Sequence, residues 1–210
     1  MTDPNAARTF RLRSTYVECG RLAMLSHLEV AHTLERTVRR ARLPFAISQG
    51  FSPHMKIAFG AALPVGVGSA CEIFDLQLTE YVPANEAFEA LEAASVPDLM
   101  VRSCRYIENK APAASVAFPF STYEVRFDDD VNSIEVPQSI SVVRKRKEKT
   151  LVVADYLALP FELDGDRALF ALEAKPTGSL RPDVLLSHCD IPANVVSITR
   201  IAQSDVSPAK

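Results

Sequence analysis

The stretch Thr9–Val17 (TFRLRSTYV) followed by Ser26–Arg42 (SHLEVAHTLERTVRRAR) decides the fold. In the first segment apolar and polar side chains alternate, which predicts a half-buried strand with Arg11 and Arg13 on its polar face. In the second, apolar residues recur every three or four positions, which predicts a helix with one apolar side. Ser26 begins a capping-box sequence, so the helix should start there and end near Arg42.

The residues that follow extend this pair into a longer pattern. Short strands are predicted around a Gly/Pro loop, then a second helix and a closing strand, at Phe45–Ser48, Lys56–Ala62, Glu72–Leu78, Asn85–Ala94 and Met100–Ile107. The order is β-α-β-β-α-β, with Phe45–Ser48 as an extra short strand. That order is typical of the ferredoxin-like split βαβ pattern, which places two helices on one face of an antiparallel sheet and leaves the other face for a partner.

The second half is predicted to begin the same order again. Its predicted elements are a strand, a weak helix interrupted by Pro137, a basic strand, a hairpin, a short helix and a last strand, at Ser121–Phe127, Val131–Ile140, Ser141–Lys147, Thr150–Leu163 with Ala168–Lys175, Pro182–His188 and Val195–Ile201. We therefore expect an α+β protein of two ferredoxin-like (βαββαβ) halves with antiparallel sheets and helices on one face. The halves would span residues 8–109 and 121–203, with a linker at 110–120 and a disordered tail at 204–210.

Length, hydrophobic content and cysteine spacing restrict the classes of protein to which this chain can belong. The chain has 210 residues, 48% of them hydrophobic, and no apolar run that approaches the roughly 20 residues needed to cross a bilayer. The N-terminus lacks the features of a secretory signal, so we expect a cytoplasmic protein. The four cysteines form no C-x-x-C pair and are too scattered to hold an iron–sulfur cluster. The sequence thus predicts no metal site and no cofactor of its own.

Positive charge is concentrated in two places. Residues 1–60 carry nine Lys and Arg against four acids, a local net charge of +5, whereas the other 150 residues carry 14 against 22, a net charge of −8. Within the acidic part lies the basic run Arg144, Lys145, Arg146, Lys147 and Lys149. These segments, with Arg39 and Arg40 on the first helix, could contact phosphate, although a solvated strand and helix face explain the same pattern.

The loop between Ser48 and Lys56 is the stretch richest in groups that bind ligands. It holds a hydroxyl, an amide, a flexible glycine, an aromatic ring, an imidazole and an ammonium group, on Ser48, Gln49, Gly50, Phe51, His54 and Lys56. Phe51 could stack on a flat ring while the cations bind an anionic oxygen. The alternative is a structural turn in which Phe51 fills the core and His54 caps a backbone group. Both interpretations remain open at this point.

A second loop, Lys175–Pro182, places Ser179 and Arg181 just before a short helix. Backbone amides and a guanidinium can cradle an anion there, although an ordinary helix start is the commoner explanation. No catalytic set is readable, because the histidines have no metal-ligand spacing and carboxylates such as Asp75 are too common to be paired from sequence. Whether the chain is an enzyme therefore stays open.

These residues resemble a known family, the bacterial radical-SAM-associated domain of unknown function. The motifs that carry the resemblance are Gly20–Leu22, Leu25–Glu29, Leu34–Arg36, Arg39–Ala41, Ser48–Phe51, Pro53–His54, Lys56–Ile57, Leu63–Val67, Gly178–Pro182 and Thr199–Arg200. The resemblance runs from Phe10 to Arg200 and implies a partner in radical chemistry, but no established reaction. The cluster and cofactor of that partner, a radical SAM protein, would lie on a separate chain.

Two functions follow from these observations. The first is an RNA-binding or RNA-modification accessory module without its own cofactor, in which the basic segments contact phosphates and Phe51 stacks on a base. The alternative is a protein-interaction domain that docks to a radical SAM enzyme or positions its substrate, with the 48–56 loop and Arg181 at the joint site. A small-molecule enzyme that uses His54 and Lys56 ranks behind both, because no catalytic set accompanies them.

Overall fold

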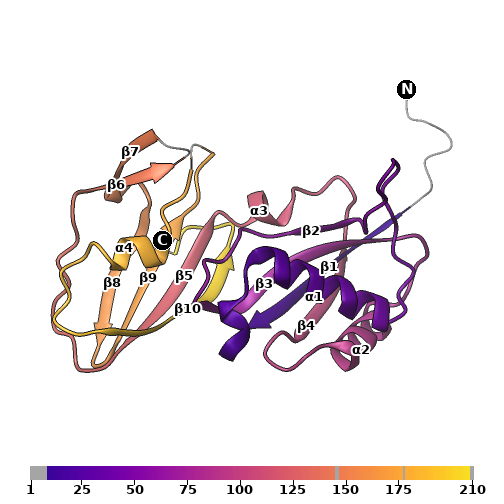
Figure 1. Cartoon of the computed structure of the whole chain (residues 1–210), viewed down its shortest axis with the longest axis horizontal. Coiled ribbons are helices and arrows are strands. Elements are labelled where there is room, and N and C mark those ends of the chain that lie inside the picture. The colour runs from indigo at the N-terminus through magenta and orange to yellow at the C-terminus, as the bar shows by residue number, and fades with distance from the viewer. Residues whose placement is uncertain (1–8, 145–146, 177, 209–210) are drawn as a thin grey trace. The chain divides into compact units, whose positions relative to one another are not determined.

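The computed structural model describes residues 9–144, 147–176 and 178–208. The protein is a mixed α/β structure with a large, mostly antiparallel sheet and few helices (Figure 1). Its backbone contacts divide it into two compact units. Unit 1 comprises residues up to Ala62 together with Cys71–Val116, and unit 2 comprises Leu63–Ala70 together with the residues from Ala117 onward.

Unit 1 follows the predicted element order. It contains β1 (Phe10–Glu18), the short 3-10 helix η1 (Gly20–Met24), α1 (His27–Arg40), β2 (Ile57–Phe59), most of β3 (Val67–Leu78), α2 (Ala84–Ala94) and β4 (Val101–Ile107). The strands are ordered β4-β1-β3, with β2 on β3, and the β4–β1 and β2–β3 pairs are antiparallel. Instead of an extra strand, residues 45–48 form two isolated bridges, Phe45 with Leu78 and Ile47 with Met55.

The start of α1 confirms the predicted capping box. Ser26 Oγ accepts a hydrogen bond from the Glu29 amide at 3.4 Å, and Glu29 Oε2 accepts one from the Ser26 amide at 2.8 Å. The helix ends at Arg40, two residues earlier than predicted, and Arg42 adopts a left-handed backbone conformation with a φ of 55°. This turn directs the chain away from the helix axis into the segment that carries the 48–56 loop.

The core of unit 1 lies between the two helices and one face of the sheet. Its buried side chains come from β1, β3, α1, α2 and the segments beside them, and include Leu12, Tyr16, Val30, Leu34, Val38, Phe74, Leu76, Leu78, Ala87 and Leu91. Because strand side chains alternate between faces, Arg11, Arg13 and Asp75 lie on the opposite face of the same strands. All three are buried as well, so the polar face of β1 is not the solvated surface that the alternation predicts.

Unit 2 contains mainly strands. They are β5 (Phe120–Phe127), β6 (Ser139–Arg144), β7 (Lys147–Val152), β8 (Leu157–Asp164), β9 (Arg167–Glu173) and β10 (Val195–Ser204), with the 3-10 turn η2 (Val153–Asp155) and the helix α4 (Pro182–Leu186). The first residues of β3 pair in parallel with β10, and the order continues β10-β5-β9-β8 with antiparallel pairing. The strands β6 and β7 form a separate two-stranded ribbon. The four-residue helix α3 (Ala114–Ala117) lies at the boundary between the units.

Two predictions for the second half are wrong. Residues 131–138 form no helix; this segment is extended, with Glu135 bridged to Asp190, before β6 begins at Ser139. Pro137 lacks an amide proton, and the β-branched residues Val131, Ile134 and Val136 disfavour a helix. The strand expected at Thr150–Leu163 is broken by η2 into β7 and β8. The predicted ferredoxin-like order of the second half is therefore not confirmed.

The hairpin predicted at Asp164–Asp166 is present between β8 and β9. Gly165 has a φ of 59°, a conformation that side chains rarely tolerate, which explains the glycine in this turn. None of the helices in the described part of the chain is long and apolar enough to cross a membrane.

Candidate functional site

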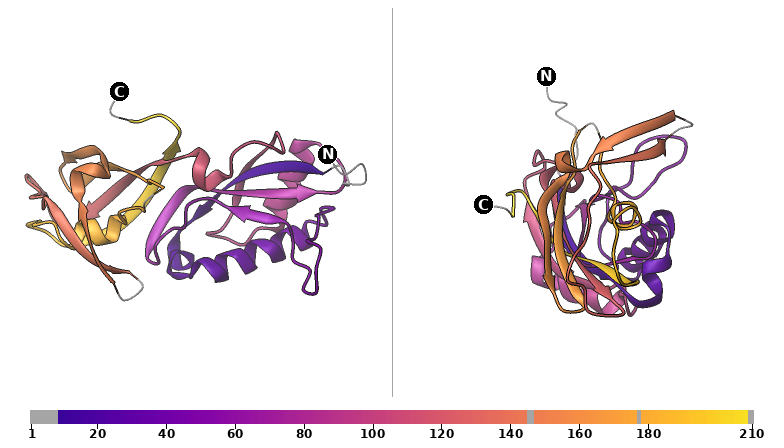
Figure 2. Two further views of the ribbon diagram at one scale, coloured as in Figure 1. Left: turned by 90° about the horizontal axis from the view of Figure 1, so that it is seen from above. Right: turned by 90° about the vertical axis from the view of Figure 1, so that its left-hand side faces the viewer.

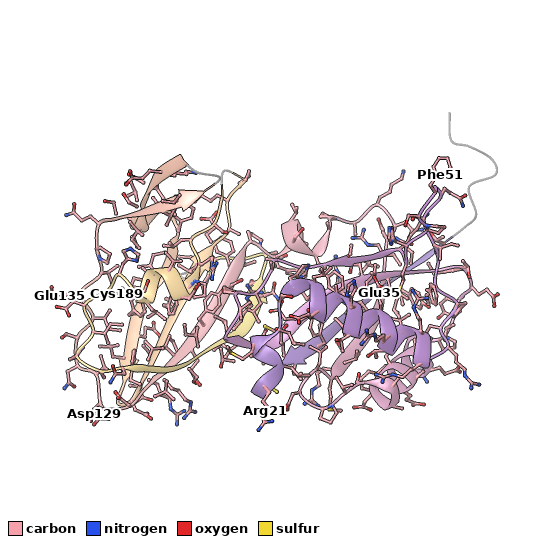
Figure 3. All side chains as sticks on the ribbon, viewed as in Figure 1. Arg21, Glu35, Phe51, Asp129, Glu135 and Cys189 are labelled. Carbon is pink, nitrogen blue, oxygen red and sulfur yellow. The ribbon has the colours of Figure 1, made fainter. Side chains whose placement is uncertain are left out.

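The 48–56 loop is a closed hairpin with an exposed aromatic tip. The Ser48 amide donates to the His54 carbonyl at 2.8 Å, and the His54 amide donates to Ser48 Oγ at 3.0 Å. Phe51 is fully exposed, with a relative accessibility of 114%, and Figure 3 shows it at the far end of the hairpin. Met55 instead fills the core. The alternative in which Phe51 fills the core therefore does not describe this loop.

The other polar groups of the loop also face solvent. Gln49, His54 and Lys56 are exposed, and Ser48 is half-buried because its hydroxyl is used inside the hairpin. Gly50 has a φ of 139°, and a Cβ built there would meet no atom within 4 Å. The glycine is thus required by the backbone conformation of the tip and not by a close neighbour.

The base of the hairpin contacts the last turn of α1. The Arg39 guanidinium lies 5.2 Å from the centre of the Phe45 ring and 3.9 Å from the Glu35 carboxylate. The Ala46 amide donates to the Gln77 carbonyl, and the Gln77 amide donates to the Lys56 carbonyl, so both arms of the hairpin are fixed to β3. The hairpin rises to one side of the C-terminal end of α1 (Figures 1 and 2). Arg39 and the hairpin therefore belong to one surface of unit 1.

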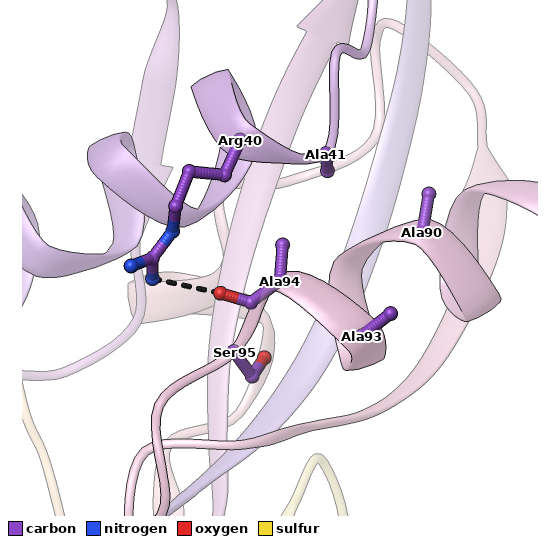
Figure 4. Close-up of a pocket in the computed structure, with 6 residues that line it drawn as sticks. All are labelled: Arg40, Ala41, Ala90, Ala93, Ala94 and Ser95. Atoms are coloured by element: carbon purple, nitrogen blue, oxygen red, sulfur yellow. Dashed lines mark hydrogen bonds between the residues drawn. The ribbon is translucent and has the colours of Figure 1, made fainter.

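Arg40 points in a different direction. Its guanidinium donates to the Ala94 carbonyl at 2.7 Å, which joins the ends of α1 and α2 (Figure 4). It borders an open cavity of about 520 Å³ whose other lining residues are small: Ala41, Ala90, Ala93, Ala94 and Ser95. An arginine at the C-terminal end of a helix interacts favourably with its unpaired carbonyls. Of these two neighbouring arginines, Arg39 contacts Phe45 at the base of the hairpin, whereas Arg40 binds the end of α2.

A buried charge cluster lies on the sheet face opposite the helices of unit 1. Asp75 accepts hydrogen bonds from Arg11 Nη2 at 2.6 Å, Arg13 Nε at 2.7 Å and Arg13 Nη2 at 2.9 Å. The same guanidinium groups donate to the carbonyls of Asn109, Ala111 and Pro112. Burial acts to raise the pKa of Asp75, but the hydrogen bonds from Arg13 and Arg11 outweigh it and hold the pKa below its ordinary value.

Sequence reasoning missed this cluster. The signal for it was present, because Asp75 is a lone carboxylate in the apolar strand Ile73–Leu78 and two arginines alternate on one face of β1. Since the cluster holds the 109–112 segment against the sheet, this face is partly covered by the protein's own chain. It is a structural element and not an open binding surface.

In unit 2, Arg181 lies beside the β6–β7 ribbon. Arg181 is the N-cap residue of α4 and makes a two-pronged ion pair with Asp183 in the first turn. Together with residues of the ribbon and of α4 it lines a cavity of about 170 Å³. Ser179, in the same loop, is half-buried. Arg144 ends β6 and pairs in register with Lys147, whereas Lys145 and Arg146 lie outside the described residues.

The thiols and acids of the described residues provide no metal-binding group, and burial weakens two of the thiols as nucleophiles. Burial raises the pKa of Cys104, and it raises the pKa of Cys189 to about 11, so neither is a ready nucleophile. No set of three or more His, Cys, Asp or Glu side chains within the described ranges is placed to hold a metal ion.

Comparison with known proteins gives a family but no activity. None of the curated proteins matches this chain. A crystal structure of an unknown protein from Galdieria sulphuraria is similar over 90% of this chain and 99% of its own, at 13% sequence identity and a TM-score of 0.32. The model of the family DUF2344, described as an uncharacterized protein conserved in bacteria, matches residues 11–182. Because this match spans most of the sequence, the chain belongs to the DUF2344 family of uncharacterized bacterial proteins.

Proposed function

We propose that this protein is a cytoplasmic RNA-binding accessory module without its own cofactor, and that single-stranded RNA binds at the 48–56 hairpin and the adjacent end of α1. The observation that carries the proposal is the fully exposed ring of Phe51 at the hairpin tip. A phenylalanine with no packing role costs solubility, and single-stranded RNA is bound largely by stacking of bases on such rings.

The charges around the hairpin support the same proposal. Lys56, Arg36 and Arg42 are exposed, and no acidic side chain in the described part of the chain forms an ion pair with them. Arg39 has one weak pairing, with Glu35 at 3.9 Å. Exposed cations on the hairpin, on α1 and in the turn after it can contact the phosphates that flank a base stacked on Phe51.

The architecture of unit 1 gives secondary support. We infer a ferredoxin-like fold for this half, because its elements run β-α-β-β-α-β and its strands are ordered β4-β1-β3-β2. Ferredoxin-like sheets of RNA-binding modules often use their open face, but here Arg11 and Arg13 on that face are occupied by Asp75 and the 109–112 segment. The proposal therefore rests on the hairpin and the end of α1.

A second candidate function is docking to a radical SAM protein on a separate chain, whose substrate this chain would help to position. The observation that favours it is a pair of exposed apolar side chains, Met24 at 66% and Leu28 at 64% accessibility, where η1 leads into α1. Exposed apolar residues that are close together are typical of protein interfaces. Binding through this surface would depend little on salt, whereas RNA binding should weaken steeply as salt is added.

The test is a fluorescence-anisotropy titration of the protein with labelled single-stranded RNA, structured RNA and a duplex, each at two salt concentrations. We expect salt-sensitive binding that is tightest for the single strand. Phe51→Ala should weaken it roughly 5- to 150-fold, because one base–aromatic stack contributes about 1–3 kcal/mol. Phe51→Trp should retain binding, and Phe51→Leu, which keeps apolar volume but no ring, should behave like the alanine variant.

Charge variants provide the matched controls. Lys56→Ala should lower the affinity and reduce the salt dependence, whereas Arg167→Ala removes another exposed positive charge, from unit 2, and should change neither. The double variant Lys145→Ala/Arg146→Ala tests whether the basic run of the second half takes part. An absence of binding at low salt, or equal binding by Phe51→Ala and the unaltered protein, would refute the proposed RNA site and favour a protein partner.

A further inference from the structure

A small cavity in unit 2 lies outside the proposed RNA site. It has a volume of about 170 Å³ and is lined by Val142, Val143, Leu151, Leu180, Arg181 and Val184. Leu151 and Leu180 are almost completely buried, Val142 and Val184 are partly buried, and Val143 and Arg181 are exposed. The buried side chains of the lining are thus aliphatic, and the rim that solvent reaches includes Arg181 and Val143.

The cavity exists because the β6–β7 ribbon packs against the rest of unit 2 with only one of its faces. Ile140 and Leu151 are cross-strand partners and both are buried in the unit 2 core. The next pair on the same face is Val142 with Lys149. Opposite residues of an antiparallel pair share a face. Along this face the buried Ile140–Leu151 pair is therefore followed by a pair of one valine and one lysine. A space remains where the ribbon extends past the last core residues.

The lining determines what the interior can hold. Five of the six lining residues are Val or Leu, and their side chains offer no hydrogen bond to water or to a polar ligand. Apolar cavities of about 150 Å³ stay dry and bind compact hydrocarbons the size of benzene. An aliphatic group of similar bulk therefore suits the interior, and a polar or charged group does not.

The rim determines the polarity of the rest of the ligand. Arg181 uses Nε and Nη2 to bind Asp183, and no acceptor among the described residues contacts its Nη1 group. A guanidinium has five N–H donors, so those of Nη1 can still bind an anion. An anion at the mouth of the cavity is therefore favoured over a cation.

We propose that this cavity binds a short branched aliphatic group that ends in a carboxylate, with the hydrocarbon between Leu151, Leu180 and Val184 and the carboxylate at Arg181. Two sources offer this chemistry: a free branched-chain carboxylic acid, and the C-terminal leucine of a peptide. The site is independent of the hairpin in unit 1, so the two proposals can fail separately.

The experiment uses the full chain with labelled Val and Leu methyl groups and follows their NMR signals during titration. The probes are 4-methylpentanoate and the alcohol and amine with the same carbon skeleton. We expect saturable shifts at Val142, Leu151, Leu180 and Val184, with the acid binding about two- to fivefold more tightly than the alcohol, because Arg181 is half exposed and its ion pairs are screened. The amine should bind most weakly.

Variants and a second set of probes complete the design. Val184→Phe should fill the cavity and abolish the shifts, whereas Val196→Phe changes an exposed valine and should leave them unchanged. Arg181→Gln, at an exposed position, should reduce the affinity for the acid to that for the alcohol.

A second set of probes distinguishes the two sources. If an acetylated tripeptide Gly-Gly-Leu binds more tightly than 4-methylpentanoate, and loses this advantage when its carboxylate is amidated, the source is a peptide. If 4-methylpentanoate binds more tightly, the source is a free acid. Shifts spread over surface valines, or equal affinity for acid, alcohol and amine, would overturn the proposal.

Discussion

Replacing Asp75 by asparagine should destabilise unit 1 more than any exposed charge change. The Asp75 carboxylate is 3% exposed and accepts three hydrogen bonds from Arg11 and Arg13, which are 8% and 5% exposed. Asparagine keeps the shape and one acceptor oxygen but removes the negative charge that accepts three hydrogen bonds from the two buried guanidinium groups. Breaking a buried ion pair from one side costs about 3–5 kcal/mol, a large part of the stability of an ordinary domain.

Urea unfolding followed by far-UV circular dichroism measures this loss, because the chain has no tryptophan to report on the transition. The matched control is Glu35→Gln, which removes a carboxylate in the same unit that is 3.9 Å from a half-exposed Arg39. An exposed pair of this kind contributes at most about 1 kcal/mol. If Asp75→Asn costs no more than Glu35→Gln, the cluster does not stabilise the fold and the reasoning is wrong.

The pH dependence gives an independent check on the same cluster. Because the arginines hold the pKa of Asp75 below its ordinary value, folding favours the ionised carboxylate. Its stabilisation is then complete above the pKa of an unfolded aspartate, about 3.9, and is lost as the pH falls through the lower pKa of the folded state. The difference in unfolding free energy between the unaltered protein and Asp75→Asn should stay constant near neutral pH and shrink in acid. A difference that grows in acid would contradict this account.

Three further predictions concern local features of the two units. Ser26→Ala removes the capping box of α1 and should cost about 1 kcal/mol in urea unfolding, with Ser26→Gly costing less. Leu185→Ala leaves a cavity at a fully buried position of unit 2 and should cost about 2–5 kcal/mol by the same measurement. Iodoacetamide should alkylate Cys19 before Cys189, as followed by mass spectrometry. Burial and the hydrogen bond to Asp98 raise the pKa of Cys19, but Cys19 is exposed, whereas Cys189 is partly buried and burial raises the pKa of its thiol to about 11.

Much of unit 1 could be predicted from sequence because its signals are local. The alternation at Thr9–Val17 and the capping box at Ser26 each specify an element through neighbours a few residues away, and β1 and α1 lie where these signals place them. The burial of the polar face of β1 was not predicted, because it depends on contacts that are distant in the chain. Its burial depends on Asp75 and on the 109–112 segment, which are distant in the chain, and no periodicity in β1 reports them.

Unit 2 was harder to predict because its segments lack strong periodicity. Residues 131–138 mix β-branched residues with Pro137, and their extended path is fixed by tertiary contacts such as the bridge between Glu135 and Asp190. Single-sequence patterns weigh local propensity and cannot anticipate such contacts. The cavity beside Arg181 was missed for the same reason, since its lining comes from three segments that meet only in the fold.

Burial reduces the number of positive side chains in residues 1–60 that a ligand can reach. The sequence of residues 1–60 has a net charge of +5, but Arg11 and Arg13 are buried and hydrogen-bonded to Asp75 on the sheet face opposite the helices, and Arg40 is bound to the end of α2. Arg21 is exposed at the opposite end of α1 from the hairpin (Figure 3). The cations of α1, the turn after it and the hairpin that stay exposed and are not bound to the end of α2 are Arg36, Arg39, Arg42 and Lys56.

This smaller set makes the RNA proposal quantitative. Each phosphate contact to a single strand lowers the logarithm of the binding constant by about 0.7 per tenfold rise in salt, so four contacts predict a slope of roughly −3. Removing Lys56 should bring the slope to roughly −2. A slope near −6 would require the cations of the whole basic half, including Arg11 and Arg13, which the fold has already paired with Asp75. Measuring the slope therefore tests the proposed surface as directly as removing the Phe51 ring.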